Sequence, residues 1–182
     1  MKKLILSIFL IPAVFSAQQT VSRDPEIANY VSQVSADSLK SHINKLVSFG
    51  TRHTMSSTTD AKKGIGAARN WVLSKFKNYA KNTDGRMEVF LQSQTIQPDG
   101  KRINQSTDLG NAIAILRGTD PNDKRIFMIG GHLDSRVSDV MNNKDFAPGA
   151  NDDGSGVGAV IESARILSQS KFPATIVFVA FS

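Results

Sequence analysis

The sequence predicts an α/β fold: a three-layer sandwich with a mixed, mostly parallel central sheet flanked by helices. Helical patterns come first along the chain, and strand-like apolar runs then alternate with one further helix. Two of these runs, 126–129 and 176–181, flank that helix, which predicts a parallel, right-handed βαβ unit. Because neither run alternates apolar with polar residues, we expect both strands to be central and buried on two faces.

Three helices are expected before the first strand. The first opens at Asp24, which can cap it, with Pro25 in its first turn. The second ends at Gly50, and we expect His42 to be a surface residue of that helix. The three expected ranges are 24–34, 36–49 and 60–80.

The remaining elements follow from alternation and from turn residues. The turn at 97–100 predicts a hairpin or an excursion between the first two strands. A helix with apolar residues at helical spacing separates the last two strands. Strands are expected at 87–96, 111–116, 126–129 and 174–181, and this last helix at 155–168.

The first residues have the pattern of a secretory signal peptide. Lys2 and Lys3 precede an apolar run, 4–15, which is followed by small and polar residues. We expect residues 1–17 to be this signal and 18–182 to be the N-terminal part of a single domain. The protein would then be exported, to the periplasm or outside the cell. No later stretch has the length of a membrane span.

Composition limits the chemistry that this chain can perform. The net charge is +6, but the sequence has no Lys/Arg block interleaved with aromatic residues, so nothing in it supports nucleic-acid binding. The sequence has no cysteine, which excludes disulfides, thiolate metal ligands and a cysteine nucleophile. Any metal must therefore be held by His, Asp or Glu.

One apolar run ends at a glycine pair and is followed by His132 and Asp134. Residues two apart on a strand end point to the same side. Asp134 can therefore fix the tautomer of the imidazole, as the carboxylate behind a metal-bound histidine does. A His-x-Asp pair by itself is also compatible with an ordinary hydrogen-bonded pair at a strand end.

Asp152 and Asp153 stand in a glycine-rich turn at the start of the last expected helix. Either carboxylate could cap that helix, but a cap needs only one of them. Imidazole with carboxylates suits Zn²⁺, and a shared carboxylate suits a two-metal site. A serine mechanism through Ser155 is disfavoured, because the G-x-S-x-G pattern after a strand is missing.

The combination of GGHLDSR at 130–136 with NDDGSG at 151–156 resembles the co-catalytic zinc aminopeptidases of the M28 type, which are secreted and vacuolar exopeptidases. FGTRHT at 49–54 and NAIAILRGTDP at 111–121 extend the resemblance over most of the chain. The resemblance implies a zinc-exopeptidase-like fold and two Zn²⁺ ions per complete site. It also implies peptide substrates with a free N-terminus and attack by a metal-activated water.

The resemblance also implies residue roles. His132 would bind one zinc, Asp134 would orient it as part of the catalytic machinery, and Asp152 would bridge both ions. The peptide bond between Asp152 and Asp153 would be cis. Family members continue their last matching strand with Gly-Glu-Glu, which supplies the general base and a further ligand.

The sequence as given ends at Ser182, before that motif. We therefore expect the isolated 182 residues to hydrolyse little or no substrate, and their uncovered sheet to favour aggregation. Glu162 is expected on a helix face rather than in the missing role. Two other functions remain open: a glutaminyl-peptide cyclotransferase with one zinc, and a non-catalytic binding domain. The oligomeric state is not predicted.

Overall fold

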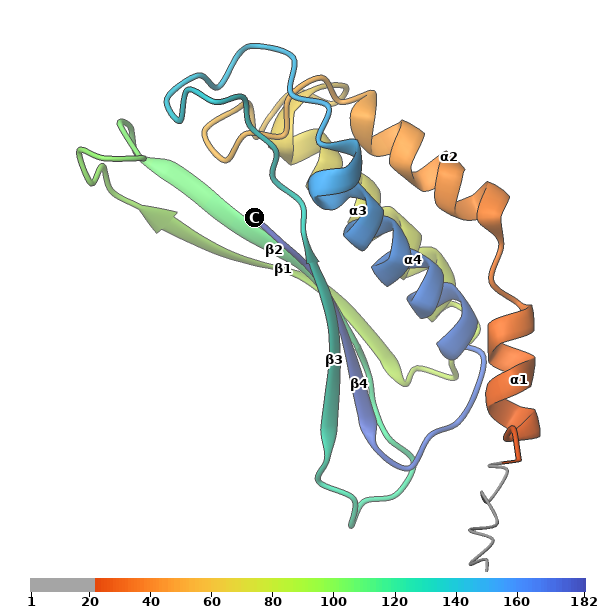
Figure 1. The fold of residues 1–182 in the computed structure, drawn as a ribbon. Helices are drawn as coiled ribbons and strands as arrows, with labels where there is room; N and C mark the ends of the chain where they lie inside the picture. Colours follow the sequence, from red (N-terminus) through yellow and green to blue (C-terminus); the bar gives the residue numbers. More distant parts are fainter. Residues whose placement is uncertain (1–21) are drawn as a thin grey trace, which may run out of the picture.

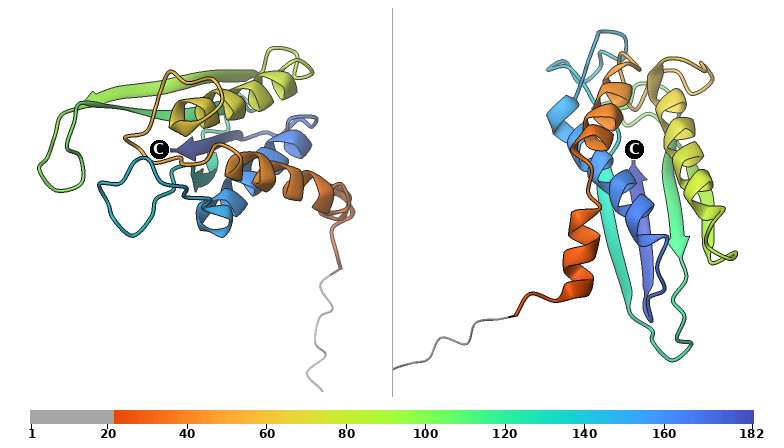
Figure 2. Two further views of the ribbon diagram at one scale, coloured as in Figure 1. Left: turned by 90° about the horizontal axis from the view of Figure 1, so that it is seen from above. Right: turned by 90° about the vertical axis from the view of Figure 1, so that its right-hand side faces the viewer.

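A four-stranded mixed sheet carries the helices on one of its faces in the computed structural model, which describes residues 22–182 (Figures 1 and 2). The expected signal peptide, residues 1–17, lies outside the described residues. No helix among residues 22–182 has the length and apolar character needed to cross a membrane. The elements in chain order are α1 (Pro25–Ser32), α2 (Ala36–Val47), α3 (Gly64–Ala80), β1 (Met87–Ile96), β2 (Thr107–Leu116), β3 (Ile126–His132), α4 (Gly156–Leu167) and β4 (Thr175–Phe181).

The strand order is β1-β2-β4-β3. β1 and β2 form an antiparallel hairpin, β2 is antiparallel to β4, and β3 is parallel to β4. The expected α/β fold with a mixed sheet is confirmed, and so is the parallel pairing of the two runs that flank α4. Two details differ within the described residues. Most strand pairings are antiparallel rather than parallel, because the hairpin reverses direction. Helices cover only one face of the sheet, which gives two layers rather than three.

Local capping explains where the first two helices begin. The carboxylate of Asp24 accepts hydrogen bonds from the backbone N–H groups of Glu26 and Ile27, and Ser35 caps α2 in the same way. α3 begins at Gly64, later than expected. Gly64 has φ +83°, and a Cβ there would lie 2.7 Å from the carbonyl oxygen of Ser57. The loop before α3 therefore packs too tightly to continue the helix backwards.

The core lies between the helices and the covered face of the sheet. α3 and α4 supply most of its helical side chains, and β2 and β4 supply most of the strand side chains. His42 belongs to this packed region, so its expected place on the surface is wrong. His42 is 6% exposed because α2 rests on α4 and on the turn that precedes it, and its ring packs edge-on against Trp71 of α3. The largest fully buried core side chains are Phe76, Phe178, Leu46, Ile65, Leu116, Leu133 and Ile161.

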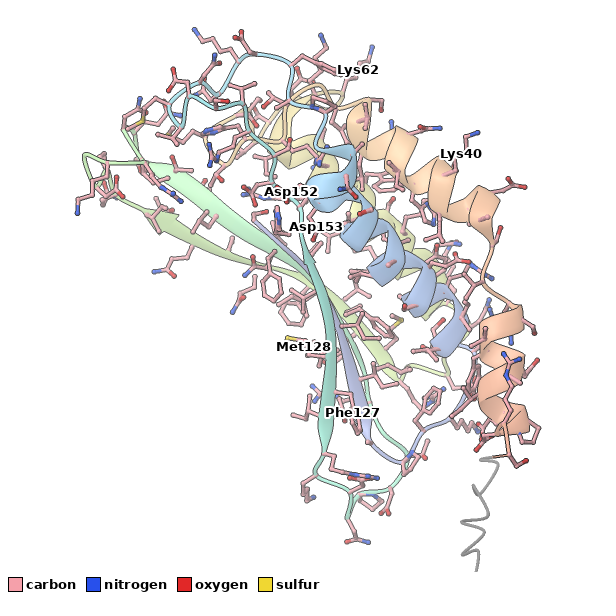
Figure 3. The ribbon with its side chains drawn as sticks, viewed as in Figure 1. Lys40, Lys62, Phe127, Met128, Asp152 and Asp153 are labelled. Atoms are coloured by element: carbon pink, nitrogen blue, oxygen red, sulfur yellow. The ribbon has the colours of Figure 1, made fainter. Side chains whose placement is uncertain are left out.

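The two central runs have different environments. β4 is largely buried, as its apolar sequence predicts, whereas Ile126, Phe127 and Met128 on β3 are 67%, 54% and 62% exposed. Figure 3 labels Phe127 and Met128 on this strand. The expected two-sided burial of β3 is therefore wrong within the described residues. The reason is its position: β3 is an edge strand, and its outer side has no described neighbour.

Glu162 on α4 is buried and bonded rather than exposed on a helix face. Its carboxylate accepts bonds from the guanidinium of Arg165 at 2.7 and 2.9 Å and from the backbone N–H of Ser35 at 2.9 Å. Arg165 also donates to the carbonyl oxygen of Gln33. These bonds connect α4 to the link between α1 and α2. The bond from Arg165 outweighs the effect of burial and holds the pKa of Glu162 below its ordinary value of 4.5.

Replacing Glu162 with Gln is expected to lower the free energy of unfolding at pH 7 by about 2 kcal/mol, because buried bonds to a charged group are lost. A depressed pKa contributes stability that is present above pH 4.5 and is lost as the pH falls through the folded-state pKa. The variant should therefore lose less stability than the wild type on acidification. Urea denaturation at several pH values measures both effects. Glu88→Gln is the control, because its pair with Arg117 is about half exposed, and it should change little. Equal effects of the two substitutions would contradict this prediction.

Candidate metal centre

The end of β3 and the start of α4 lie close together because a glycine stands where they touch. A Cβ on Gly131 would lie 2.9 Å from backbone atoms of Gly156 and Val157, so a side chain there would push α4 away from the strand. The close approach places His132 beside the irregular turn Ala150–Ser155, which precedes α4. The fold therefore joins the two acidic motifs that the sequence separates by about twenty residues.

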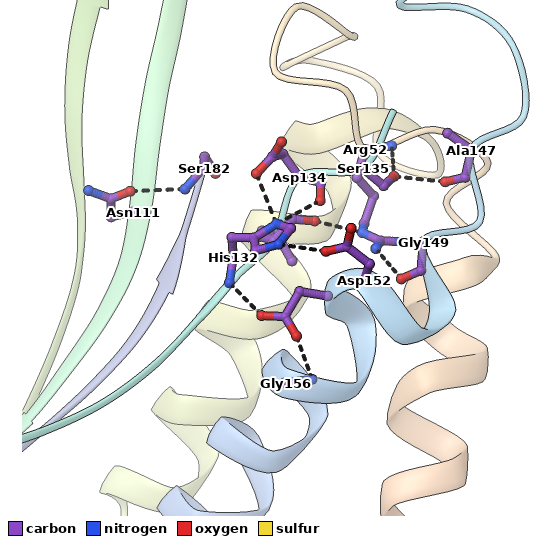
Figure 4. Close-up of polar contacts among 12 residues, drawn as sticks. Arg52, Asn111, His132, Asp134, Ser135, Ala147, Gly149, Asp152, Gly156 and Ser182 are labelled. Carbon is purple, nitrogen blue, oxygen red and sulfur yellow. Dashed lines mark hydrogen bonds and ion pairs between the residues drawn. The ribbon is translucent and has the colours of Figure 1, made fainter. Parts of the chain in front are cut away.

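Both imidazole nitrogens of His132 face a carboxylate (Figure 4). Nε2 lies 2.9 Å from Asp152 Oδ1, and Nδ1 lies 3.3 Å from Asp134 Oδ1. The side chains of His132 and Asp152 are 46% and 89% exposed, so an ion from solution can reach them. The three residues line an open pocket of about 280 Å³, whose other walls are Ser135, Arg136, Val137 and Ser138.

The carboxylates determine the protonation of His132. Partial burial acts to lower the pKa of His132, but the charge of Asp134 and the hydrogen bond with Asp152 together raise it above the ordinary value of 6.5. Without a metal, these carboxylates stabilise the imidazolium form. A cation that binds Nε2 must therefore displace a proton, and acid must weaken its binding.

Asp153 has a different function from its neighbour. Its carboxylate accepts hydrogen bonds from the backbone N–H groups of His132, at 2.9 Å, and Gly156, at 3.0 Å. Asp153 therefore connects the end of β3 to the start of α4, while Asp152 faces the pocket. The peptide bond between the two residues is cis, as the resemblance implied. Asp153 is thus structural, whereas the carboxylate of Asp152 lies in the pocket beside His132.

The side chains at the pocket are of the types that bind zinc, but they do not make up a complete set of ligands. An imidazole and a carboxylate converge at the pocket, and both are ligands that Zn²⁺ accepts. Within residues 22–182, no group of three or more His, Cys, Asp or Glu side chains could hold a metal ion. The described residues therefore provide two donors and the orienting carboxylate of Asp134.

Ser155 and His53, the histidine of the FGTRHT stretch, do not line the pocket. The hydroxyl of Ser155 donates to the carbonyl oxygen of Asn151, 2.7 Å away. His53 is buried, and its ring is bonded to the carbonyl oxygen of Val140 and the N–H of Met55. Sequence reasoning missed Arg52, a buried cation behind the pocket. Its only sequence signal is its position inside the FGTRHT stretch.

Known proteins are similar to the part of the chain that carries the candidate site. Residues 111–182, which contain His132, Asp134 and Asp152, match the family model described as Peptidase family M28. By this match, residues 111–182 belong to peptidase family M28. A "Probable zinc metalloprotease" of Leptosphaeria maculans is 43% identical over 157 residues, which cover 86% of this chain and 36% of that protein. The chain thus spans about a third of the length of the curated relatives it matches.

Solved structures share the fold of this chain. The LapA aminopeptidase of Legionella pneumophila aligns with a TM-score of 0.63 and 21% identity, over 100% of this chain and 43% of that one. The glutaminyl cyclase of Fimbriiglobus ruber aligns with a TM-score of 0.61 and 19% identity, over 81% of this chain and 45% of that one. These matches establish a fold that is common to both kinds of enzyme.

Proposed function

We propose that the full-length protein is an exported zinc exopeptidase that removes N-terminal residues from peptides. One observation carries this proposal: His132 Nε2 and Asp152 Oδ1 lie 2.9 Å apart at an open pocket, with Asp134 behind the imidazole. The names of the M28 relatives support zinc and proteolysis. The signal-like first residues support export.

Each site residue has a role in this proposal. His132 would hold a zinc ion through Nε2, and the carboxylate of Asp152 would serve as a further zinc ligand. Zinc bound there supplies Lewis acidity toward a peptide carbonyl and lowers the pKa of a nearby water molecule. The Nδ1–H of His132 donates to Asp134, whose carbonyl oxygen and carboxylate Oδ1 both lie 3.3 Å away, and this directs the lone pair of Nε2 into the pocket. Asp153 holds the backbone of His132 in place.

The exopeptidase specificity rests on the resemblance to co-catalytic zinc aminopeptidases. The expectation that residues 1–182 are inactive alone has separate support, because residues 22–182 provide no group of three donors. Cyclisation of N-terminal glutamine is the second candidate function. The fold shared with a glutaminyl cyclase favours it, whereas the paired acidic turn at Asp152 and the intact His132–Asp134 pair favour the peptidase.

The test uses the full-length protein, loaded with zinc and freed of excess metal. We expect close to two zinc ions per chain and hydrolysis of aminoacyl anilides with a free α-amine. N-acetylated forms of the same anilides should not be cleaved, and residues 18–182 alone should cleave neither. Elemental analysis and a chromogenic assay measure these outcomes. One zinc per chain with cyclisation of a Gln-initiated peptide would contradict the proposal, and so would cleavage of the acetylated substrate.

A further inference from the structure

Arg52 is a buried cation whose partners are almost all backbone carbonyls. Its side chain is 1% exposed, although it lies in a polar loop. Nε donates to the carbonyl oxygen of Leu133 at 2.7 Å, and Nη2 donates to that of Gly149 at 3.0 Å. Nη1 donates to the carbonyl oxygens of Leu46 and Pro148 at 3.0 and 2.9 Å. One planar group therefore connects three separate segments of the chain.

Two of these segments carry the metal centre. Leu133 lies between His132 and Asp134, so the bond from Nε holds the backbone of both site residues. The carbonyl oxygen of Gly149 also accepts a bond from the N–H of Gly154, at 2.9 Å, on the far side of Asp152. Arg52 thus holds the strand end and the acidic turn at a fixed separation (Figure 4).

Ser135 extends this connection through the backbone. Its hydroxyl accepts from the N–H of Arg52 at 3.1 Å and donates to the carbonyl oxygen of Ala147 at 2.7 Å. Its N–H donates to the carbonyl oxygen of Arg52. Gly149 must lack a side chain here, because its Cβ would lie 2.6 Å from Ser135 Cβ and 2.8 Å from Arg52 Nη2.

The charge of Arg52 is not neutralised by a direct ion pair among the described residues. Burial lowers its pKa to about 10, and the charges of Asp134 and Asp153 oppose that shift. Arg52 therefore remains a cation at neutral pH. Its geometry is also hard to replace, because a lysine ammonium is a single point and cannot donate from three nitrogens to separate carbonyls.

We propose that Arg52 is a positioning residue of the metal centre, which fixes the distance between the His132–Asp134 strand end and the turn that carries Asp152. The proposal rests on the proposed zinc function. It assigns to Arg52 an effect on zinc affinity and coordination geometry, exerted through the carbonyl oxygens of Leu133 and Gly149.

The test compares wild type, Arg52→Lys and Arg86→Lys in the full-length protein. Arg86 is the matched control, because it also donates to a backbone carbonyl, that of Ser170, away from the pocket. Zinc affinity is measured by competition with a chelator, and geometry by the visible absorption of the Co²⁺-substituted protein. We expect Arg52→Lys to weaken zinc binding at least about tenfold and to shift the Co²⁺ bands. Arg86→Lys should change neither.

A folded Arg52→Lys variant with wild-type zinc affinity and an unchanged Co²⁺ spectrum overturns the inference. If that variant does not fold, Ser135→Ala decides: a smaller loss of affinity with a shifted Co²⁺ spectrum supports the inference, and wild-type behaviour overturns it. The two proposals can fail separately. Wild-type protein that binds no zinc overturns the proposed function and this inference together, whereas zinc binding that is indifferent to Arg52 overturns only the inference.

Discussion

Replacing His132 with alanine is expected to abolish tight zinc binding by the full-length protein and to lower kcat/KM by roughly a thousandfold or more. The substitution removes one of the two convergent donors and leaves Asp152 without its imidazole partner. A lost metal forfeits several kcal/mol of charge stabilisation in the transition state, and about 1.4 kcal/mol corresponds to a factor of ten. Equilibrium dialysis and peptide hydrolysis measure the two effects.

His53→Gln is the control for this experiment. His53 is a buried histidine in a loop, its ring is bonded to Val140 and Met55, and it does not line the pocket. We expect this variant to retain the zinc content of the wild type. Full zinc occupancy in His132→Ala would refute the ligand role of His132.

Replacing Phe178 with alanine is expected to lower the free energy of unfolding by about 3–5 kcal/mol. Phe178 is fully buried at the centre of β4, where its neighbours in the sheet are Ala114 on β2 and Ile129 on β3. Truncation leaves a cavity that the surrounding strands cannot close. Chemical denaturation of the full-length protein measures the loss.

Phe178→Leu tests the cause of this loss. Leucine keeps most of the buried apolar volume, so it should cost less than half as much as alanine. A similar cost for both substitutions would indicate that Phe178 matters through something other than the filled volume.

Periodicity and turn chemistry were sufficient to predict the main elements of the fold. The unbroken apolar run of β4 predicted a buried strand, and Phe178 and Val179 are indeed buried. The same reasoning was wrong for β3, because Phe127 and Met128 are exposed. An apolar run indicates that a strand is suited to burial. It does not indicate whether the described residues include the elements that would bury it.

The candidate site divides in a similar way. His132 and Asp152 could be selected from the sequence because metal-binding side chains followed an apolar strand and opened a helix. The burial of Arg52 could not be predicted, because an arginine in a polar loop is normally exposed. Its burial depends on carbonyl groups from three distant segments, and sequence spacing gives no information about them.

The strand order also determines when the metal centre can form during folding. Within the described residues, β3 pairs only with β4, which lies beyond the whole of α4 in the chain. His132 can therefore pair with Phe181 only after the long segment between β3 and β4 has brought the two strands together. Closing such a loop costs entropy before any contact compensates for it, so this pairing is slower than formation of the β1–β2 hairpin. The hairpin can assemble early, and the strand end that carries His132 is among the last parts of the sheet to become ordered.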